Sequence, residues 1–367
     1  MMNRRDFSAA AGALSVLGAS SIAMAQGKRV FRVANPTGAV DAAQLSNITC
    51  GRHPRLRYYE TEGIDLDFVS MSSITQAMLS VVTGRADLAP LVPTVFLPAL
   101  AKEPGLGLVA AYNWLPGNAN VVVVNADSPI RSISDLAGKR IGIRNQGDGG
   151  VLQFQLMLTE LGLPTSDINF IAIGDQGVAG TALSQGKVDA FVTFDTAAGR
   201  IEALGFPLRY LPLPPDYGRL TVSAYGFRKK AIKEDRKNVV GFCRAVAKST
   251  LFAYTNLAQA INIHWSLYPD SRPKSKSEEE SRQEILIILK QRRNNWIRRA
   301  DAPDQRWGAS SLDEWKSIIE IAARSSKNPA LPQQIGAPRD VFTNDLIDEV
   351  NQFDKADVIR QAKAFRI

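Results

Sequence analysis

Residues 84–90 read GRADLAP, and residues 186–192 read GKVDAFV. In both stretches a glycine ends a predicted helix, a basic residue and a small apolar residue follow, and an aspartate begins a predicted strand. A pattern that recurs within one chain indicates a repeated structural unit. We therefore expect two similarly built lobes, each formed around its own sheet.

The residues before the first of these stretches predict an alternation of strands and helices. Residues 29–34 read RVFRVA and predict a strand, and residues 64–69 predict a second one. Between residue 64 and the first stretch, Ser73 and Gln76 have the spacing of a helix start. This order of strands and helices favours an α/β domain with a mostly parallel sheet.

The second half of the chain repeats this order before it becomes helical. Predicted strands and helices alternate over residues 121–124, 134–143, 151–161, 169–173 and 179–185. Later residues predict helices only, at 239–258, 278–299, 311–323 and 344–353. Because these helices have no strand partners of their own, we expect them to pack on lobe 1. The expected boundaries are 26–124 with 226–367 for lobe 1, and 125–225 for lobe 2, with hinge positions at Asn125 and Tyr225.

Composition restricts the class of protein. The 367 residues include 45% hydrophobic and 22% charged residues, which excludes a disordered chain. The net charge of +8 favours acidic small molecules or surfaces as partners. The cysteines are Cys50 and Cys243 and the histidines His53 and His264, and their spacing fits no zinc pattern. A Cys50–Cys243 disulfide and two free thiols both remain open.

Residues 1–25 have the features of an export signal. Arg4-Arg5 precedes an apolar run over residues 9–22, and Ala23-Met24-Ala25 forms a small-residue cleavage site, so we expect cleavage before Gln26. The arginine pair is typical of the twin-arginine route, which exports folded proteins. The alternative is a buried N-terminal helix or a membrane anchor, but the run is too short to span a bilayer. The mature chain would keep a net charge of +7, and we expect it in the periplasm.

Four segments within residues 29–225 carry a resemblance to a known family. They are EGIDL at 62–66, GRAD at 84–87, DLAGKRIG at 135–142 and GKVDA at 186–190. With these segments the chain resembles the periplasmic solute-binding proteins of ABC importers, in the family that takes nitrate, sulfonates, taurine and thiamine pyrimidine precursors. The resemblance implies the two-lobed type II periplasmic-binding fold, which closes on one small molecule and presents it to a membrane permease.

The site is expected where strands of open α/β sheets end and helices begin. Those loops are 35–38, 71–73, 90–94, 147–150, 176–177 and 194–196. The expected ligand-binding residues are Thr37, Gly38, Ser72, Ser73, Pro93, Thr94, Asn113, Trp114, Gln146, Gly147, Asp148, Gly149, Gln176 and Asp195.

Most of these residues also have a structural interpretation. Thr37 and Gly38 fit an ordinary turn as well as an oxygen-binding loop, and Ser73 fits a helix cap. Trp114 fits either a core position or a ring-stacking site. The glycine-rich loop 147–150 allows close backbone approach to a ligand, but it lacks the pattern of a nucleotide-binding loop.

Charged and aromatic residues indicate the class of ligand. Asp195 follows a predicted strand, where the family often presents an acidic residue, and either binds an amine or amide or holds the hinge. Arg144 is the base that we expect to pair with an anion, with solvent exposure as the alternative. The positive charge of the mature chain and the glycine-rich helix starts favour a small organic acid such as a sulfonate or a carboxylate. The aromatic residues Tyr112, Trp114, Phe194 and Tyr225 would suit a planar ring, which is compatible with an aromatic acid.

Other functions have less support. Related folds host enzymes such as pyrimidine-precursor synthases and lyases, yet no Ser-His-Asp or metal constellation is recognisable, so we expect neither catalysis nor a cofactor. A protein that presents its ligand to a sensor would show the same sequence features. The basic residues at 290–293 predict a solvated helix face rather than a nucleic-acid site, with permease contact as a third interpretation. We therefore expect a monomer whose partners are a small molecule and an inner-membrane ABC permease.

Overall fold

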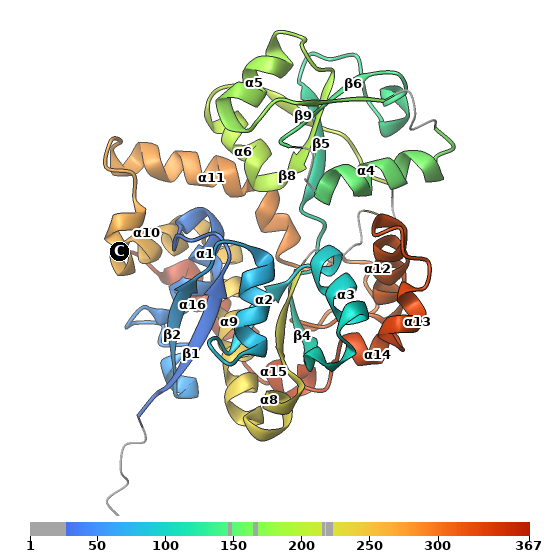
Figure 1. Ribbon diagram of the computed structural model, residues 1–367. Helices are drawn as coiled ribbons and strands as arrows, with labels where there is room; N and C mark the ends of the chain where they lie inside the picture. Colours follow the sequence, from blue (N-terminus) through green and yellow to red (C-terminus); the bar gives the residue numbers. More distant parts are fainter. Residues whose placement is uncertain (1–26, 146–148, 164–167, 215–216, 218–222) are drawn as a thin grey trace, which may run out of the picture.

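Two five-stranded sheets organise the chain, one in the upper and one in the lower part of Figure 1. The computed structural model describes residues 27–145, 149–163, 168–214, 217 and 223–367. The predicted export signal and Gln146, Gly147 and Asp148 lie outside the described residues. Within the described residues, no helix is both long and apolar enough to cross a membrane.

The two sheets have the same strand arrangement. The first contains, in spatial order, β2 (Ile64–Ser70), β1 (Arg29–Asn35), β3 (Leu88–Leu91), β10 (Ser223–Arg228) and β4 (Leu108–Leu115). The second contains β7 (Asn169–Ala172), β6 (Arg140–Ile143), β8 (Ala190–Phe194), β5 (Asn120–Asn125) and β9 (Leu208–Tyr210). In each sheet the first three strands are parallel and the fourth is antiparallel to both of its neighbours. We call each sheet with the helices packed on it lobe 1 and lobe 2.

The repeated aspartates make the same contacts in both lobes. The carboxylate of Asp87 accepts a hydrogen bond from the backbone N–H of Arg32 in β1 (2.8 Å), and that of Asp189 accepts one from the N–H of Arg140 in β6 (2.8 Å). Burial alone would raise the pKa of Asp87, but hydrogen bonds from Arg29 and Arg32 hold it below its ordinary value. Hydrogen bonds from Arg140 lower the pKa of Asp189 in the same way. The predicted two-lobed α/β fold is therefore confirmed. The helix-to-strand joint predicted from the repeated sequence is also present in both lobes.

The chain crosses between the lobes at other positions than expected. It leaves lobe 1 after Leu115 and enters lobe 2 at Asn120, because β5 pairs with β8 and β9. It returns between Tyr210 and Ser223. The expected boundary at residues 124–125 thus falls at the far end of β5. Asn125 and Tyr225, expected at the hinge, lie inside β5 and β10.

Helices flank both sheets and dominate the C-terminal third. They are α1 (Ala42–Thr49), α2 (Ile74–Val82), α3 (Pro93–Lys102), α4 (Gly149–Glu160), α5 (Gln176–Ser184), α6 (Asp195–Ala203), α8 (Lys229–Glu234), α9 (Arg236–Thr255), α10 (Leu257–Leu267), α11 (Glu278–Asn295), α12 (Leu312–Ser325), α13 (Leu331–Ile335), α14 (Pro338–Val341), α15 (Ile347–Val350) and α16 (Lys355–Ala364). Of these, α9, α10 and α13 to α16 pack on lobe 1 as expected.

An aromatic cluster holds α9 against the first sheet. Phe242 of α9 is fully buried and stacks on Phe31 of β1, with ring centroids 5.2 Å apart. Its other neighbours are Tyr225 and Phe227 of β10 and Tyr59. Burial of one such ring contributes about 1.5–3 kcal/mol to folding. This cluster explains why the C-terminal helical segment returns to lobe 1.

Helix α11 is different, because it lies between the lobes and packs on α6 of lobe 2 (Figure 1). The close approach depends on Gly199, where a Cβ would lie 2.7 Å from both the Cα and the carbonyl oxygen of Ile288. The neighbouring α10 packs on α1 and α9 of lobe 1. The helix therefore joins the two lobes.

We expect Gly199→Ala to lower the free energy of unfolding by about 1–3 kcal/mol, because a methyl group there would push against backbone atoms. Gly177→Ala in α5 is the matched control, since its Cβ would meet Leu204 Cδ1 at 3.5 Å, an ordinary contact. Alanine is favoured over glycine in helices by about 1 kcal/mol, so the control should be as stable as the wild type or more so. Urea unfolding of both variants measures the difference. An equal loss in both would contradict the close packing of α6 on α11.

Candidate functional site

A cavity of about 720 Å³ lies between the lobes, where the carboxyl ends of the parallel strands face each other. Lobe 1 contributes the end of β1, α1 and the start of α3, and lobe 2 contributes the start of β5, α4 and the end of β8. Helices α11 and α12 complete the wall. We call this space the interlobe cavity. Its size suits a small organic molecule.

Two ion pairs cross from one lobe to the other beside the interlobe cavity. Asp41, at the start of α1, pairs with Arg200 of α6 at 3.4 Å. Glu160 of α4 pairs with Arg324 of α12. All four side chains are partly exposed, so each pair contributes at most about 1 kcal/mol. They bring the lobes together without fixing them strongly.

The lobe 1 wall carries a stacked aromatic pair. The indole of Trp114 lies on the ring of Tyr225, with centroids 5.6 Å apart and planes 18° apart. Its Nε1 donates a hydrogen bond to Ser223 Oγ at 3.0 Å, which fixes the orientation of the indole. All three residues line the cavity. This wall offers a flat apolar surface to a ligand ring or alkyl chain.

Polar groups are few and come from both lobes. Thr37 Oγ1 donates to Asn35 Oδ1 at 2.8 Å. Across the cavity, Asn120 Nδ2 donates to Gln153 Oε1 at 2.6 Å. Thr94 lies in the first turn of α3, whose preceding residue supplies no side-chain cap. The N-terminal N–H groups of such a helix favour an anionic or carbonyl oxygen.

The charged side chains among the described lining residues are Arg144 and Arg292. Arg144 follows β6, and its guanidinium carbon lies 4.6 Å from the centroid of the Phe194 ring. Arg292 comes from α11 and is held by Asp195, the first residue of α6, with Nη2 2.6 Å from Oδ1. The Asp195 side chain is fully buried. An apolar cavity with guanidinium groups in its wall is suited to an organic anion.

The structure brings some of the predicted residues together and separates others. Thr37, Pro93, Thr94 and Trp114 line the interlobe cavity, and so does Arg144. The predicted residues that the described lining does not include are Gly38, Ser72, Ser73, Asn113, Gln176 and Asp195. Gly149 is the first residue of α4, and its place relative to the cavity lies outside what the structure describes. Ser73 caps α2 by accepting from Gln76 N–H at 3.2 Å, so its structural interpretation is correct.

Two of the absent residues have a clear physical reason. Asn113 lies inside β4 rather than after it, is buried, and its N–H donates to the Gly308 carbonyl at 2.8 Å. Asp195 is covered by Arg292 and Asn295, so it has no exposed surface for an amine or amide of a ligand. Both residues therefore lie behind side chains that line the cavity: Asn113 precedes Trp114 in β4, and Asp195 holds Arg292.

The sequence reasoning missed Arg292, Asn120 and Gln153, and also the side chains of α12. The solvated helix face predicted for residues 290–293 is wrong for Arg292, because this side chain is buried against Asp195. A signal was present, because Ile285, Ile288 and Leu289 form an apolar stripe in which Arg292 is the next position at helical spacing. Its place on the buried side of α11 follows from that stripe.

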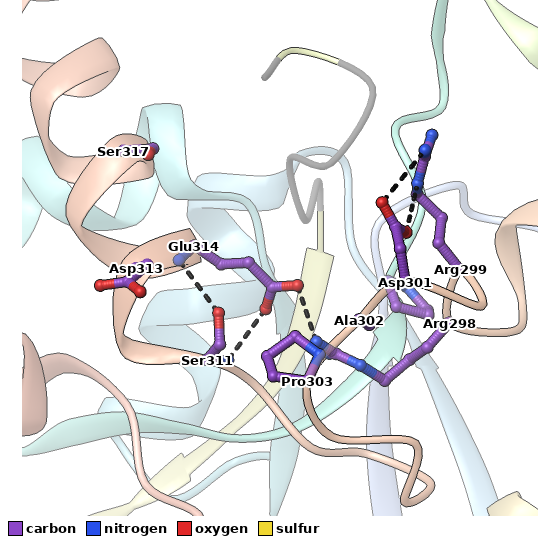
Figure 2. A pocket seen from close by; sticks show the side chains of 10 residues that line it. Arg298, Arg299, Asp301, Ala302, Pro303, Ser311, Asp313, Glu314 and Ser317 are labelled. Atoms are coloured by element: carbon purple, nitrogen blue, oxygen red, sulfur yellow. Dashed lines mark hydrogen bonds and ion pairs between the residues drawn. The ribbon is translucent and has the colours of Figure 1, made fainter. Parts of the chain in front are cut away.

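Arg298 and Arg299, which follow α11, pair with acidic neighbours. Figure 2 shows a second hollow, of about 400 Å³, in which Arg298 pairs with Glu314 at 2.7 Å and Arg299 pairs with Asp301 at 3.0 Å. Glu314 also forms a capping box with Ser311 at the start of α12. Within α11 itself, the guanidinium of Arg293 lies over the ring of Tyr254, 4.7 Å from its centroid.

The family model described as "NMT1/THI5 like" matches residues 55–260, which is more than half of the chain. This chain belongs to the NMT1/THI5-like family. A search of curated proteins finds no match. Solved structures with the same fold include the periplasmic aliphatic sulphonate-binding protein SsuA of Escherichia coli, which is 16% identical, with a TM-score of 0.57 over 87% of this chain and 99% of that one.

Two further structures resemble this NMT1/THI5-like protein. The alkanesulfonate-binding protein SsuA of Xanthomonas axonopodis pv. citri, bound to MOPS, is 18% identical, with a TM-score of 0.56 over 86% of this chain and 98% of that one. The periplasmic nitrate-binding protein NrtA of Synechocystis PCC 6803 is 11% identical, with a TM-score of 0.54 over 93% of this chain and 99% of that one. These likenesses establish the two-lobed periplasmic-binding fold.

Cysteine and histidine lie away from the interlobe cavity in this NMT1/THI5-like protein. Cys50 and Cys243 are both buried free thiols, and burial raises the pKa of each. Among the described residues, no group of three or more His, Cys, Asp or Glu is placed to hold a metal ion. His264 of α10 is buried behind α1, where Nε2 donates to the Val40 carbonyl at 3.2 Å and Nδ1 lies 2.6 Å from Thr49 Oγ1.

Burial lowers the pKa of His264 from 6.5 to about 4, so the free energy of unfolding should depend on pH. Between these two values the unfolded chain binds a proton that the folded chain does not. Stability should therefore fall as the pH is lowered through this window, by up to about 3 kcal/mol.

Urea unfolding across this pH range measures the slope. His264→Gln removes the titrating group and should make the slope shallower. His53→Gln is the comparison variant: partial burial and Arg55 also lower the pKa of His53, but by less, so this substitution should change the slope less than His264→Gln does. A His264→Gln slope equal to that of the wild type would show that the ring is not held neutral in the folded state.

Proposed function

We propose that this protein is the substrate-binding component of an ABC importer, and that it binds a small organic acid in the interlobe cavity. The observation that carries the proposal is the cavity itself, with an aromatic wall on lobe 1 and two arginines facing it from lobe 2 and α11. The shared fold with sulfonate- and nitrate-binding proteins supports the same role.

The lining favours an acid with an apolar body. Trp114, Tyr225 and Phe194 supply aromatic surface, and Leu45 and Ile48 of α1 supply aliphatic surface. Burial of such a body contributes about 25 cal/mol per Å² of apolar surface. A guanidinium group recognises carboxylate and sulfonate oxygens through charge-assisted hydrogen bonds. The ligand would therefore be a carboxylate or sulfonate that carries a ring or an alkyl chain.

Binding without turnover fits the chemistry of the described lining residues. They include no histidine, cysteine, aspartate or glutamate, so no general base or nucleophile of these types faces the cavity from the described part of the chain. An enzyme of the pyrimidine-precursor type would need such a group in reach of its substrate. The fold is then used to hold a ligand between lobes that open and close.

The location and the partner are further parts of the proposal. The signal-like residues 1–25 would direct the chain through the twin-arginine route to the periplasm, where it would deliver its ligand to an inner-membrane permease. Lobe 1 would consist of residues before the first crossing together with the C-terminal helices, and lobe 2 of the residues between the crossings. The hinge would include the crossing at residues 116–119 rather than lie in the neighbouring strands.

A true ligand should raise the melting temperature and make the molecule more compact, because it binds the closed native form. At about 100 times its Kd, it would add about 2.7 kcal/mol to the free energy of unfolding. A thermal-shift screen of sulfonates, aromatic and aliphatic carboxylates, nitrate and pyrimidines identifies it, and small-angle X-ray scattering then measures the shape.

The amide of each positive acid serves as its uncharged control and should give a smaller shift. A ligand that stabilises the protein without any change in scattering would contradict closure of the lobes. Chemical conversion of the bound compound would contradict a binding role.

A further inference from the structure

We propose that Arg292 of the C-terminal helix α11 binds the acid group of the ligand, and that Phe194 and Asp195 at the β8–α6 junction position the two arginines of the interlobe cavity. This inference rests on the proposed function, since it names the residue that recognises the acid. It assigns ligand recognition to a helix outside both sheets.

The guanidinium of Arg292 has one side occupied and one side available. Its Nε lies 3.0 and 2.9 Å from the two carboxylate oxygens of Asp195, and its Nη2 lies 2.6 Å from Oδ1. Nη1 has no hydrogen-bond partner among the described residues, and Arg292 lines the cavity. The side chain is 8% exposed, so the charge is largely removed from bulk water. An acid oxygen at Nη1 would meet a strong and well-placed donor.

All acceptor sites of the Asp195 carboxylate are occupied by donors that hold Arg292 in this geometry. Besides Arg292, its Oδ1 accepts from Thr196 N–H at 2.7 Å, and its Oδ2 accepts from Asn295 Nδ2 at 2.9 Å. A carboxylate offers about four lone-pair sites, and these donors occupy them. Asp195 therefore acts as a positioning residue that fixes Arg292 in one orientation. A side chain that is already ordered loses less entropy when it binds a ligand.

The residue before Asp195 holds the second arginine. Phe194 places its ring under the guanidinium of Arg144, at 4.6 Å from the centroid, and both residues line the cavity. A guanidinium over an aromatic face is stabilised by about 0.5–2 kcal/mol. Two consecutive residues thus orient both cationic groups that the described wall presents to a ligand.

The same junction is tied to the first crossing between the lobes. The N–H of Asp195 donates to the Ala119 carbonyl at 2.7 Å, and the Asn295 carbonyl accepts from Gly117 N–H at 3.2 Å. A Cβ at Gly117 would lie 2.8 Å from Asn295 Cα, so α11 and the crossing are in close contact. Recognition at Arg292 therefore takes place directly beside the segment about which the lobes rotate.

Isothermal titration calorimetry on the full mature chain tests the inference. The probes are benzoate and benzenesulfonate, hexanoate and hexanesulfonate, each compared with its uncharged amide. Arg292→Lys keeps a positive charge for Asp195 but removes Nη1, and should reduce the preference for acid over amide by about tenfold or more. Asp195→Asn and Phe194→Leu should reduce the same preference by smaller factors. A substitution that only loosens the structure would weaken the binding of the acid and the binding of its amide equally.

Arg298→Lys is the matched control. Arg298 has a 5% exposed side chain that pairs with Glu314 and faces the second hollow, so its replacement should leave the acid preference unchanged. If the wild type binds acids and Arg292→Lys keeps their preference over amides, the inference is overturned and the proposed function stands. If the wild type binds none of the acids, both fail.

A crystal structure of the wild type with the tightest-binding acid provides a test that does not depend on the folding of a variant. We expect an oxygen of the acid within about 3.2 Å of Arg292 Nη1. An acid group bound elsewhere in the cavity would overturn the inference. The calorimetric affinities of the carboxylate and sulfonate probes show which of the two acid groups the site prefers.

Discussion

The buried ion pair between Asp195 and Arg292 is the interaction on which the arrangement of this protein depends. It joins the first residue of α6 in lobe 2 to a helix that the chain reaches only after completing lobe 1. Removal of either partner would leave a buried charge uncompensated, which commonly costs about 3–5 kcal/mol. Asn295 and the Thr196 N–H donate further hydrogen bonds to the Asp195 carboxylate, which compensate its burial.

The same helix-to-strand joint, with an aspartate at the start of the strand, occurs once in each lobe. Asp87 and Asp189 each bind the backbone of the neighbouring parallel strand and a strand arginine, and both carboxyl pKa values are lowered by these contacts. These contacts fix how the strand after the joint pairs with its parallel neighbour, at the end of the sheet opposite the carboxyl ends of the strands. The loops at the carboxyl ends of the strands take no part in this joint, and they contribute to the interlobe cavity.

Much of the fold could be predicted from the sequence because local rules decide it. The glycine-to-aspartate joints and the Ser73 cap are short-range signals, and each appears in the structure where it was expected. The site was predicted only for loops that follow strands, such as Thr37 and Thr94. Arg292 could not be found in this way, because its place in the wall depends on how α11 packs against α6, a long-range contact that a composition of alternating charges does not reveal.

The path of α11 also limits how the two lobes can move. This helix packs on α6 of lobe 2, whereas α10 before it packs on lobe 1 and α12 after it packs on both α3 of lobe 1 and α4 of lobe 2. Lobe 2 and α11 are therefore joined to the rest of the chain through four connections: β4 to β5, β9 to β10, α10 to α11, and α11 to α12. Opening of the lobes would have to break the Asp41–Arg200 and Glu160–Arg324 pairs, while α11 stays attached to α6 by close packing at Gly199.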